Sequence, residues 1–375
     1  MRRGGAWLRS ALVAAAVATA LAGGCSRARH ALLPLQTANP HKYAHVACVH
    51  VVPGREAALH LLVPAANFTG QESYSHNARK FAADLAGLGA LKAAVSGQGS
   101  FVMVLGDDGS LPRPVLDRLL AAGAPLVSHA LRGADDVDRV VLGPDYHFIE
   151  NDGFRETITA LDARHAPLRD RAPTVFWRGS TTGAPLDAFR EENPDTSTDV
   201  SNCLTLPRVQ AALRAVATPW TDVGLSAPVQ NCDNEPALAA LRQQNLLHSH
   251  VQAPDWAAHR GVLEVDGNAN AWGAIWRLAS GSVVFKVSSP WVNAYNRRQN
   301  DWVHHVPVAA DLADFELTTS LAASADPRVL DRLATIAANA RALAAEFTYE
   351  AEVARVGREL EAVWGAGAAR AAAAP

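Results

Sequence analysis

Short apolar runs alternate with amphipathic stretches through the first half of the chain. Apolar runs at residues 46–52, 101–105 and 125–128 predict strands. Helical spacing of apolar residues at 75–91 and 113–122 predicts helices between them. Because strands that alternate with helices typically form parallel sheets, the pattern predicts an α/β fold.

A second cycle of the same kind begins near residue 174. Between the two cycles, residues 160–173 carry arginines and prolines that interrupt the apolar pattern, so a domain boundary is expected there. The predicted strands of the second cycle lie at 175–179, 260–267, 282–287 and 303–308, and its predicted helices at 207–216, 235–243 and 272–279.

The carboxyl-terminal part of the chain has a strong helical pattern. Asp326 followed by Pro327 is a typical helix start, and apolar residues then recur on one face as far as Phe347. The expected domains are therefore 46–165 and 170–325, followed by a long helix over 326–364 and a disordered alanine-rich tail over 365–375.

Composition narrows the class of protein. The 375 residues are long enough for two domains, and 49% hydrophobic with 19% charged residues is typical of a globular protein. The net charge is −3, from 34 basic and 37 acidic residues, so no basic excess exists to bind a nucleic-acid backbone.

Residues 1–30 resemble a targeting segment. Two arginines precede an uncharged run from Ala11 to Ala22, which predicts a signal peptide or a marginal signal-anchor that would give membrane association. Cys25 also fits, imperfectly, the cleavage box of a bacterial lipoprotein. Residues 31–45 are expected to be an extended lead-in. Asn67-Phe68-Thr69 is a glycosylation triplet consistent with a secretory lumen.

The cysteine spacing does not indicate a metal site. No Cys-x-x-Cys pair occurs, so structural zinc is not expected. Cys203 and Cys232 could form a disulfide in an oxidising lumen and leave Cys48 unpaired, and three buried free thiols are an equal alternative.

Two stretches at predicted strand ends carry candidate chemistry. The first offers a guanidinium, an approachable backbone and three hydroxyls, which together suit a diphosphate; the alternative is a polar turn that caps a helix. Its candidate ligands are Arg178, Gly179, Ser180, Thr181 and Thr182.

The second stretch places polar residues in a loop at a helix start, where free N–H groups can bind a ligand. For Trp272 and Trp276, packing against the sheet is favoured over contact with a ligand. The candidates in this stretch are Asp266, Gly267, Asn268, Asn270, Trp272, Arg277, Ser280, Gly281, Ser282 and Lys286.

These motifs occur in a recognisable order. Phe176-Trp-Arg-Gly-Ser-Thr-Thr-Gly183, Val265-Asp-Gly-Asn268, Ser280-Gly-Ser-Val-Val284 and Trp302-Val-His-His-Val-Pro-Val308 together resemble glycosyltransferase family 90, the CAP10-like family. The resemblance implies a GT-B-type fold with two Rossmann-like, doubly wound domains that face a central cleft. It also implies a UDP-sugar donor, inversion at the anomeric carbon and no required metal or other cofactor.

The resemblance also assigns residues outside the two stretches. The family's general base corresponds to Asp107, with Asp108 as a neighbouring alternative, and Asp145, Tyr146 and His147 correspond to the acceptor side. Animal members carry an arginine where this chain has Gly273. Arg178, Arg277 or Lys286 could supply that charge.

The expected activity is transfer of a sugar, glucose or xylose being favoured, from a UDP-sugar to a hydroxyl of a protein or glycan in the lumen of the ER or Golgi. One alternative is a metal-dependent GT-A transferase that uses Asp136 and Asp138. Another is a secreted or lipid-anchored carbohydrate-binding protein that has the fold without the chemistry.

Overall fold

The computed structural model describes residues 46–51, 58–61, 99–104, 113–122, 125–133, 138–183 and 200–372. The chain divides into two compact units, one of Met1–Ile149 with Glu350–Pro375 and the other of Glu150–Tyr349. The first unit therefore ends at Ile149, whereas the sequence predicts the boundary later, within residues 160–173. The targeting segment, the lead-in, the Asn67 triplet, Asp136 and the predicted helix at 75–91 lie outside the described residues.

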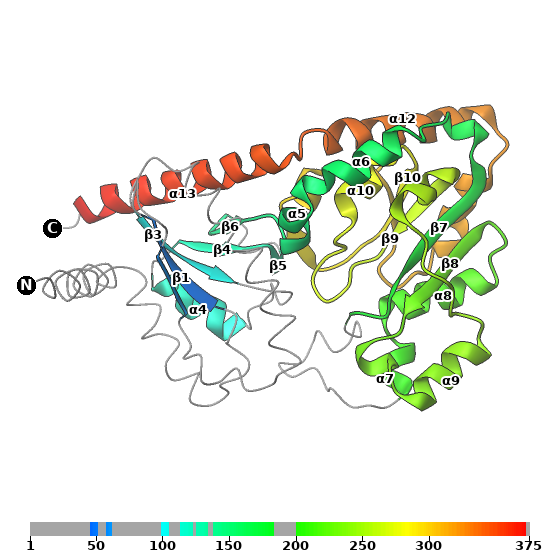
Figure 1. Cartoon of the computed structure of the whole chain (residues 1–375), viewed down its shortest axis with the longest axis horizontal. Helices are drawn as coiled ribbons and strands as arrows, with labels where there is room; N and C mark the ends of the chain where they lie inside the picture. Colours follow the sequence, from blue (N-terminus) through cyan, green and yellow to red (C-terminus); the bar gives the residue numbers. More distant parts are fainter. Residues whose placement is uncertain are drawn as a thin grey trace, which may run out of the picture. The chain divides into compact units, whose positions relative to one another are not determined.

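The first unit contains a five-stranded mixed sheet of order β2-β1-β3-β4-β6 (Figure 1). Strands β3, β4 and β6 are parallel, whereas β1 pairs antiparallel with both β2 and β3. The parallel strands that the sequence predicts are thus present, and β1 and β2 extend them in the antiparallel direction. The strands are β1 (Val46–Val51), β2 (Ala58–Leu61), β3 (Gly99–Val104), β4 (Leu126–Ser128) and β6 (Val140–Leu142).

The first unit also contains helices. Helix α4 (Arg113–Ala121) lies between β3 and β4 in the chain. The fully buried side chains of the unit include Phe101 of β3, Leu119 of α4 and Phe148 of α5. Strand β5 (Ala130–Arg132), helix α5 (Tyr146–Glu150) and most of helix α13 (Tyr349–Ala372) complete the unit. Cys48 is disulfide-bonded, which corrects the expectation that it would be unpaired.

The second unit contains a five-stranded, wholly parallel sheet of order β12-β10-β9-β7-β8. In chain order this is the 2-1-3-4-5 arrangement of a doubly wound sheet, with its topological switch point between β7 and β9. The strands are β7 (Ala172–Ser180), β8 (Thr221–Ala227), β9 (His259–Glu264), β10 (Val283–Val287) and β12 (Val306–Val308).

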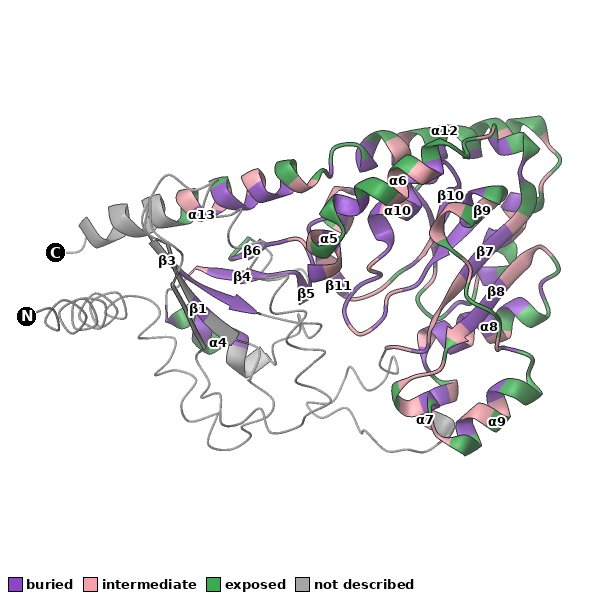
Figure 2. Ribbon diagram, viewed as in Figure 1, coloured by how far each residue is buried: buried purple, intermediate pink, exposed green. Residues whose placement is uncertain are grey.

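Both faces of this sheet are covered, so its strands are buried while the helices around them keep exposed outer faces (Figure 2). Helix α10 packs against α12 and α6, and α8 packs against β8. The helices are α6 (Arg155–Asp162), α7 (Val200–Leu204), α8 (Pro207–Val216), α9 (Glu235–Gln243), α10 (Ala274–Ala279), α11 (Phe315–Thr319) and α12 (Pro327–Ala344).

Short 3-10 turns and one short strand connect these elements. They are η2 (Asp152–Phe154), η3 (Leu168–Asp170), η5 (Gln230–Cys232), η6 (Ala253–Ala258), η7 (Asn296–Arg298), η8 (Ser320–Ala323) and β11 (Trp291–Asn293).

Most predicted elements are confirmed, and the differences have local causes. The strand expected from residue 303 begins only at Val306, because Trp302 adopts a φ of 60° in a turn and is exposed. The single long terminal helix is two helices, α12 and α13. The prediction of a disordered tail from residue 365 is also wrong as far as Ala372, because α13 continues to that residue. Within the described residues, no helix is both long and apolar enough to span a bilayer.

Candidate functional site

The switch point of the parallel sheet brings two of the predicted segments together. Residues that follow β7 and β9 leave the same edge of the sheet, because the two strands are parallel neighbours. In doubly wound sheets, ligands bind at this carboxyl edge, in the crevice where the strand order reverses. The Ser180–Thr182 segment and the Asp266–Asn270 loop therefore form the core of the candidate site.

Arg208, near the start of α8, joins these two segments. Its Nη1 donates to the Thr182 hydroxyl at 2.6 Å and to the Ser180 hydroxyl at 3.2 Å. Its Nε donates to the carbonyls of Val265 and Asp266, both at 3.2 Å. One buried guanidinium thus fixes the ends of β7 and β9 relative to each other.

Gly267 permits this close approach. A Cβ at this position would lie 2.8 Å from Oγ1 of Thr182 and 2.9 Å from Nη2 of Arg208. A larger residue would therefore force the side chains of Thr182 and Arg208 to move. Glycine at this position allows the Arg208 guanidinium to stay in contact with both segments.

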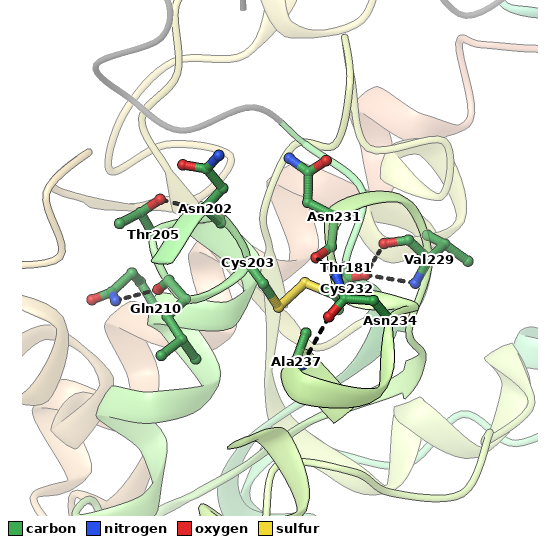
Figure 3. The surroundings of a disulfide bond; sticks show 11 residues. Thr181, Asn202, Cys203, Thr205, Gln210, Val229, Asn231, Cys232, Asn234 and Ala237 are labelled. Carbon is green, nitrogen blue, oxygen red and sulfur yellow. Dashed lines mark hydrogen bonds between the residues drawn. A yellow bond between two sulfur atoms is a disulfide. The ribbon is translucent and has the colours of Figure 1, made fainter. Parts of the chain in front are cut away.

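A disulfide supports the segment after β7 from the other side (Figure 3). Cys203 of α7 is bonded to Cys232 of η5, which settles the alternative left open by the sequence in favour of the bridge. Just before η5, Val229 exchanges two backbone hydrogen bonds with the Thr181 hydroxyl, each 2.8 Å long. Thr181 is buried and fully engaged, so its role is to position its neighbours.

The loop after β9 is organised by the Asp266 carboxylate. Its Oδ1 accepts from the Ala271 N–H at 2.7 Å, and its Oδ2 accepts from the Ser289 hydroxyl. Asn268 at the tip of the loop accepts from Gln230 Nε2 at 3.3 Å. Burial raises the pKa of Asp266, and the neighbouring Glu264 adds to the rise. The hydrogen bonds from Ala271 and Ser289 to this carboxylate fix the conformation of the loop.

Arg277 of α10 is a second buried guanidinium near this loop. It lies over the rings of Trp276 and Trp256, at 4.9 Å and 5.2 Å from their centroids. Its Nε and Nη1 are buried and have no hydrogen-bond partner among the described residues. Burial lowers its pKa, and Glu264 and Asp266 oppose that effect.

The two arginines are close enough to influence each other. Burial first, and then Arg277, lowers the pKa of Arg208 to about 10, so the Arg208 guanidinium remains charged at neutral pH. Within the part of the chain that the structure describes, neither makes an ion pair with a carboxylate. Buried charge is costly, and the attraction of Glu264 and Asp266 reaches these guanidiniums without a direct ion pair, so the pair is typical of a site that receives an anion.

Trp276 also explains why residue 273 is glycine. A Cβ at Gly273 would lie 2.6 Å from Nε1 of Trp276. A side chain at this N-cap position of α10 would thus require the Trp276 indole to move, and Arg277 lies one helical turn later. Trp272 is half-buried beside it.

Other predicted residues are used within the fold. Arg178 donates to the Asp222 carboxylate at 2.6 Å and to the Asp222 carbonyl at 2.9 Å, so its charge is paired on the face of the sheet. A Cβ at Gly179 would lie 2.4 Å from the Trp177 ring. Lys286 pairs with Glu264 at 3.0 Å.

The structure separates one predicted segment from the site. Ser280, Gly281 and Ser282 precede β10 and therefore lie at the amino edge of the parallel sheet. There the Ser282 hydroxyl donates to the His259 carbonyl at 2.7 Å, and Arg171 donates to Ser282 at 2.9 Å. This segment is thus hydrogen-bonded to the starts of β7 and β9, at the edge of the sheet opposite the Asp266–Asn270 loop.

The predicted acceptor-side residues lie in the first unit. Asp145 is buried and its Oδ1 accepts from the Phe148 N–H at 3.0 Å, which caps α5. Tyr146 and His147 follow in α5, with ring centroids 4.1 Å apart. Asp107 and Asp108 lie outside the described residues, so the role of Asp107 as base stays a prediction.

Arg208 is the main residue that sequence reasoning missed. It follows a proline at the start of a helix, which is an ordinary position for a surface arginine. The available signal was its place in the first turn of α8, a helix between the Ser180–Thr182 segment and the next strand, β8. Only the three-dimensional structure shows that its guanidinium reaches both strand ends.

Comparison with known proteins points to one family. The model of Glycosyl transferase family 90 matches residues 144–334, just over half of the 375 residues. Among solved structures, the chain is similar to HepE from Anabaena, crystallised in complex with UDP-glucose. That similarity has 12% identity and a TM-score of 0.34 and covers 79% of this chain and 70% of that chain. No curated protein sequence matches the chain.

Proposed function

Because this chain belongs to glycosyltransferase family 90, we propose that it transfers a sugar from a UDP-sugar to an acceptor hydroxyl. The match confirms the family expected from the motifs and makes the protein a glycosyltransferase. The donor, the acceptor and the course of the reaction are the proposal.

One observation supports a donor that contains a diphosphate. Arg208 and Arg277 are two buried guanidiniums without an ion-pair partner among the described residues, beside the switch point of a doubly wound sheet. A guanidinium binds phosphate oxygens through a planar fork of N–H groups. A diphosphate at the carboxyl edge would compensate both charges, and Nε and Nη1 of Arg277 would become its donors.

In the proposed reaction, Asp107 accepts the proton of the attacking hydroxyl. The oxygen attacks the anomeric carbon from the face opposite the diphosphate, so the bond to the diphosphate breaks with inversion. Negative charge grows on the leaving diphosphate in the transition state, and pre-positioned arginines stabilise it there without reorganisation. No metal ion is needed in this scheme.

Glucose or xylose is the proposed sugar, and a protein or glycan the proposed acceptor, as the family resemblance implies. The Cys203–Cys232 disulfide supports an oxidising compartment such as the lumen of the ER or Golgi. A bacterial envelope lipoprotein, anchored through Cys25, is the alternative location.

The test is release of UDP from UDP-glucose and UDP-xylose by the full-length protein, with acceptor peptides or glycans and with excess EDTA. We expect turnover that EDTA leaves unchanged, and a loss of at least 100-fold in kcat for Asp107→Asn but not for Asp108→Asn. Abolition by EDTA would favour the metal-dependent GT-A alternative. Sugar binding without any turnover of the wild-type protein would favour the carbohydrate-binding alternative.

A further inference from the structure

Four polar side chains cluster where β9 and β10 end. Glu264 is the last residue of β9, Lys286 lies beside it in register on β10, and Gln299 and His305 come from the segment before β12. Glu264, Gln299 and His305 are only 2%, 8% and 5% exposed. A buried group of this polarity costs free energy unless its atoms are hydrogen-bonded.

Three contacts already use part of the hydrogen-bonding capacity of this cluster. Lys286 Nζ lies 3.0 Å from Glu264 Oε1 and 3.3 Å from Gln299 Oε1. His305 Nε2 lies 3.0 Å from an oxygen of Asp301. These contacts hold each side chain in a fixed orientation.

Three buried atoms remain without a partner among the described residues. They are Oε2 of Glu264, Nε2 of Gln299 and Nδ1 of His305. Burial, and then the neighbouring Lys286, lowers the pKa of His305 to about 4, so the ring is neutral at pH 7. Because a carboxylate can only accept, the proton must lie on Nε2, and Nδ1 is an acceptor.

The unpartnered set is therefore two acceptors and one donor. An anion does not fit, because Glu264 is ionised: burial raises its pKa, but Lys286 and Arg277 outweigh burial and lower it. A cation does not fit beside the Lys286 ammonium. Two hydroxyl groups do fit, since each can donate to an acceptor and one can also accept from the amide.

The cluster adjoins the candidate site. Glu264 precedes Asp266 by two residues, and the charge of Lys286 acts on Asp266. Glu264 in turn acts on Arg277. The cluster therefore lies within electrostatic range of the arginine pair, so one ligand with both an anionic group and hydroxyls can contact both.

We propose that Glu264, Gln299 and His305 form a subsite that binds a pair of neighbouring hydroxyl groups of the donor. This inference rests on the proposed function and extends it from the diphosphate to the polyol part of the same ligand. Two parts of a UDP-sugar carry such a pair, the ribose and the transferred sugar, and the experiment separates them.

Calorimetric titration of the full-length protein with UDP, 2′-deoxy-UDP and UDP-glucose tests the inference. The variants are Gln299→Leu, which removes the donor at similar volume, and His305→Asn, which changes the acceptor. Asn300→Ala is the matched control, because Asn300 is the exposed neighbour of Gln299 in the same segment. Thermal unfolding of each variant checks that it is folded.

If the hydroxyls are those of the ribose, Gln299→Leu lowers affinity for UDP and UDP-glucose about tenfold each, and wild type binds 2′-deoxy-UDP weakly. If they are those of the sugar, only UDP-glucose binding falls. Wild-type affinity of folded Gln299→Leu and His305→Asn for every ligand would overturn the subsite. Failure of the wild-type protein to bind any of the three ligands would instead overturn the proposed function, and the subsite with it.

Discussion

Arg208 and Thr182 meet at 2.6 Å, guanidinium to hydroxyl, although one begins a helix and the other follows a strand 26 residues earlier. The same guanidinium reaches the carbonyls after β9. A single side chain therefore sets the spacing between the two segments that flank the switch point. The expected effects of changing it and its neighbours follow from these contacts.

Arg208→Lys retains the charge but removes the planar fork that contacts both strand ends. An ammonium cannot donate to the hydroxyls and the carbonyls at once, so the loop after β9 should no longer be held against the segment after β7. We expect KM for the UDP-sugar to rise at least tenfold. Arg214→Lys, an exposed position on the same helix, is the control and should behave as wild type. Equal KM values for the two variants would contradict this role.

Gly273→Ala places a methyl group against the Trp276 indole. Overpacking of this kind destabilises a protein by about 1–3 kcal/mol, so the urea midpoint should fall. The Trp276→Leu background provides the matched test, because removal of the indole should make the alanine nearly neutral. A cost that persists in that background would show that contact with Trp276 is not the cause.

Cys203→Ser combined with Cys232→Ser opens a loop whose ends are 29 residues apart. Chain entropy alone predicts a loss of roughly 3–4 kcal/mol. Because the bridge anchors the turn that binds Thr181, the affinity for UDP should fall as well. Denaturant unfolding and UDP titration of the same sample separate the two effects. A stable variant with wild-type affinity would show that the bridge is dispensable.

His305 should make stability depend on pH. Its pKa falls from an ordinary 6.5 to about 4 on folding, because burial and Lys286 disfavour the charged ring. Below pH 6.5 the unfolded chain therefore binds a proton that the folded chain does not. Stability is lost as the pH falls towards 4, by up to about 3 kcal/mol at roughly 1.4 kcal/mol for each unit.

The measurement is the urea midpoint of wild type and of His305→Asn between pH 4 and pH 7. The wild-type midpoint should decrease more steeply as the pH falls, because asparagine does not titrate. Parallel curves would show that His305 titrates normally in the folded protein.

Local patterns in the sequence predict the elements of the second unit well. Helix α9 and helix α8 begin and end where apolar spacing and prolines place them. The segments after β7 and β9 were also correctly paired, because parallel strands present their ends at one edge. Strand β1 was predicted at 46–52, but its antiparallel direction was not, since an apolar run carries no information about strand direction.

The site itself was only partly predictable. Ser280, Gly281 and Ser282 were grouped with Asp266 because they are near it in sequence, yet a helix and the length of the sheet lie between them. Arg178 pairs with Asp222 on the neighbouring strand, a contact that sequence spacing does not reveal, and its role in donor binding stays a prediction. The role of Arg208 depends on helix docking, which sequence spacing does not encode.

The affinity for UDP of two matched variants, Arg277→Met and Arg171→Met, tests the central claim most directly. Both remove a buried guanidinium at similar volume, one beside the carboxyl edge of the sheet and one at the amino edge. We predict that Arg277→Met weakens UDP binding at least tenfold, because a diphosphate loses a charged donor pair, while Arg171→Met retains wild-type affinity. Unchanged binding by folded Arg277→Met, or an equal loss in both variants, would contradict a diphosphate site at the carboxyl edge.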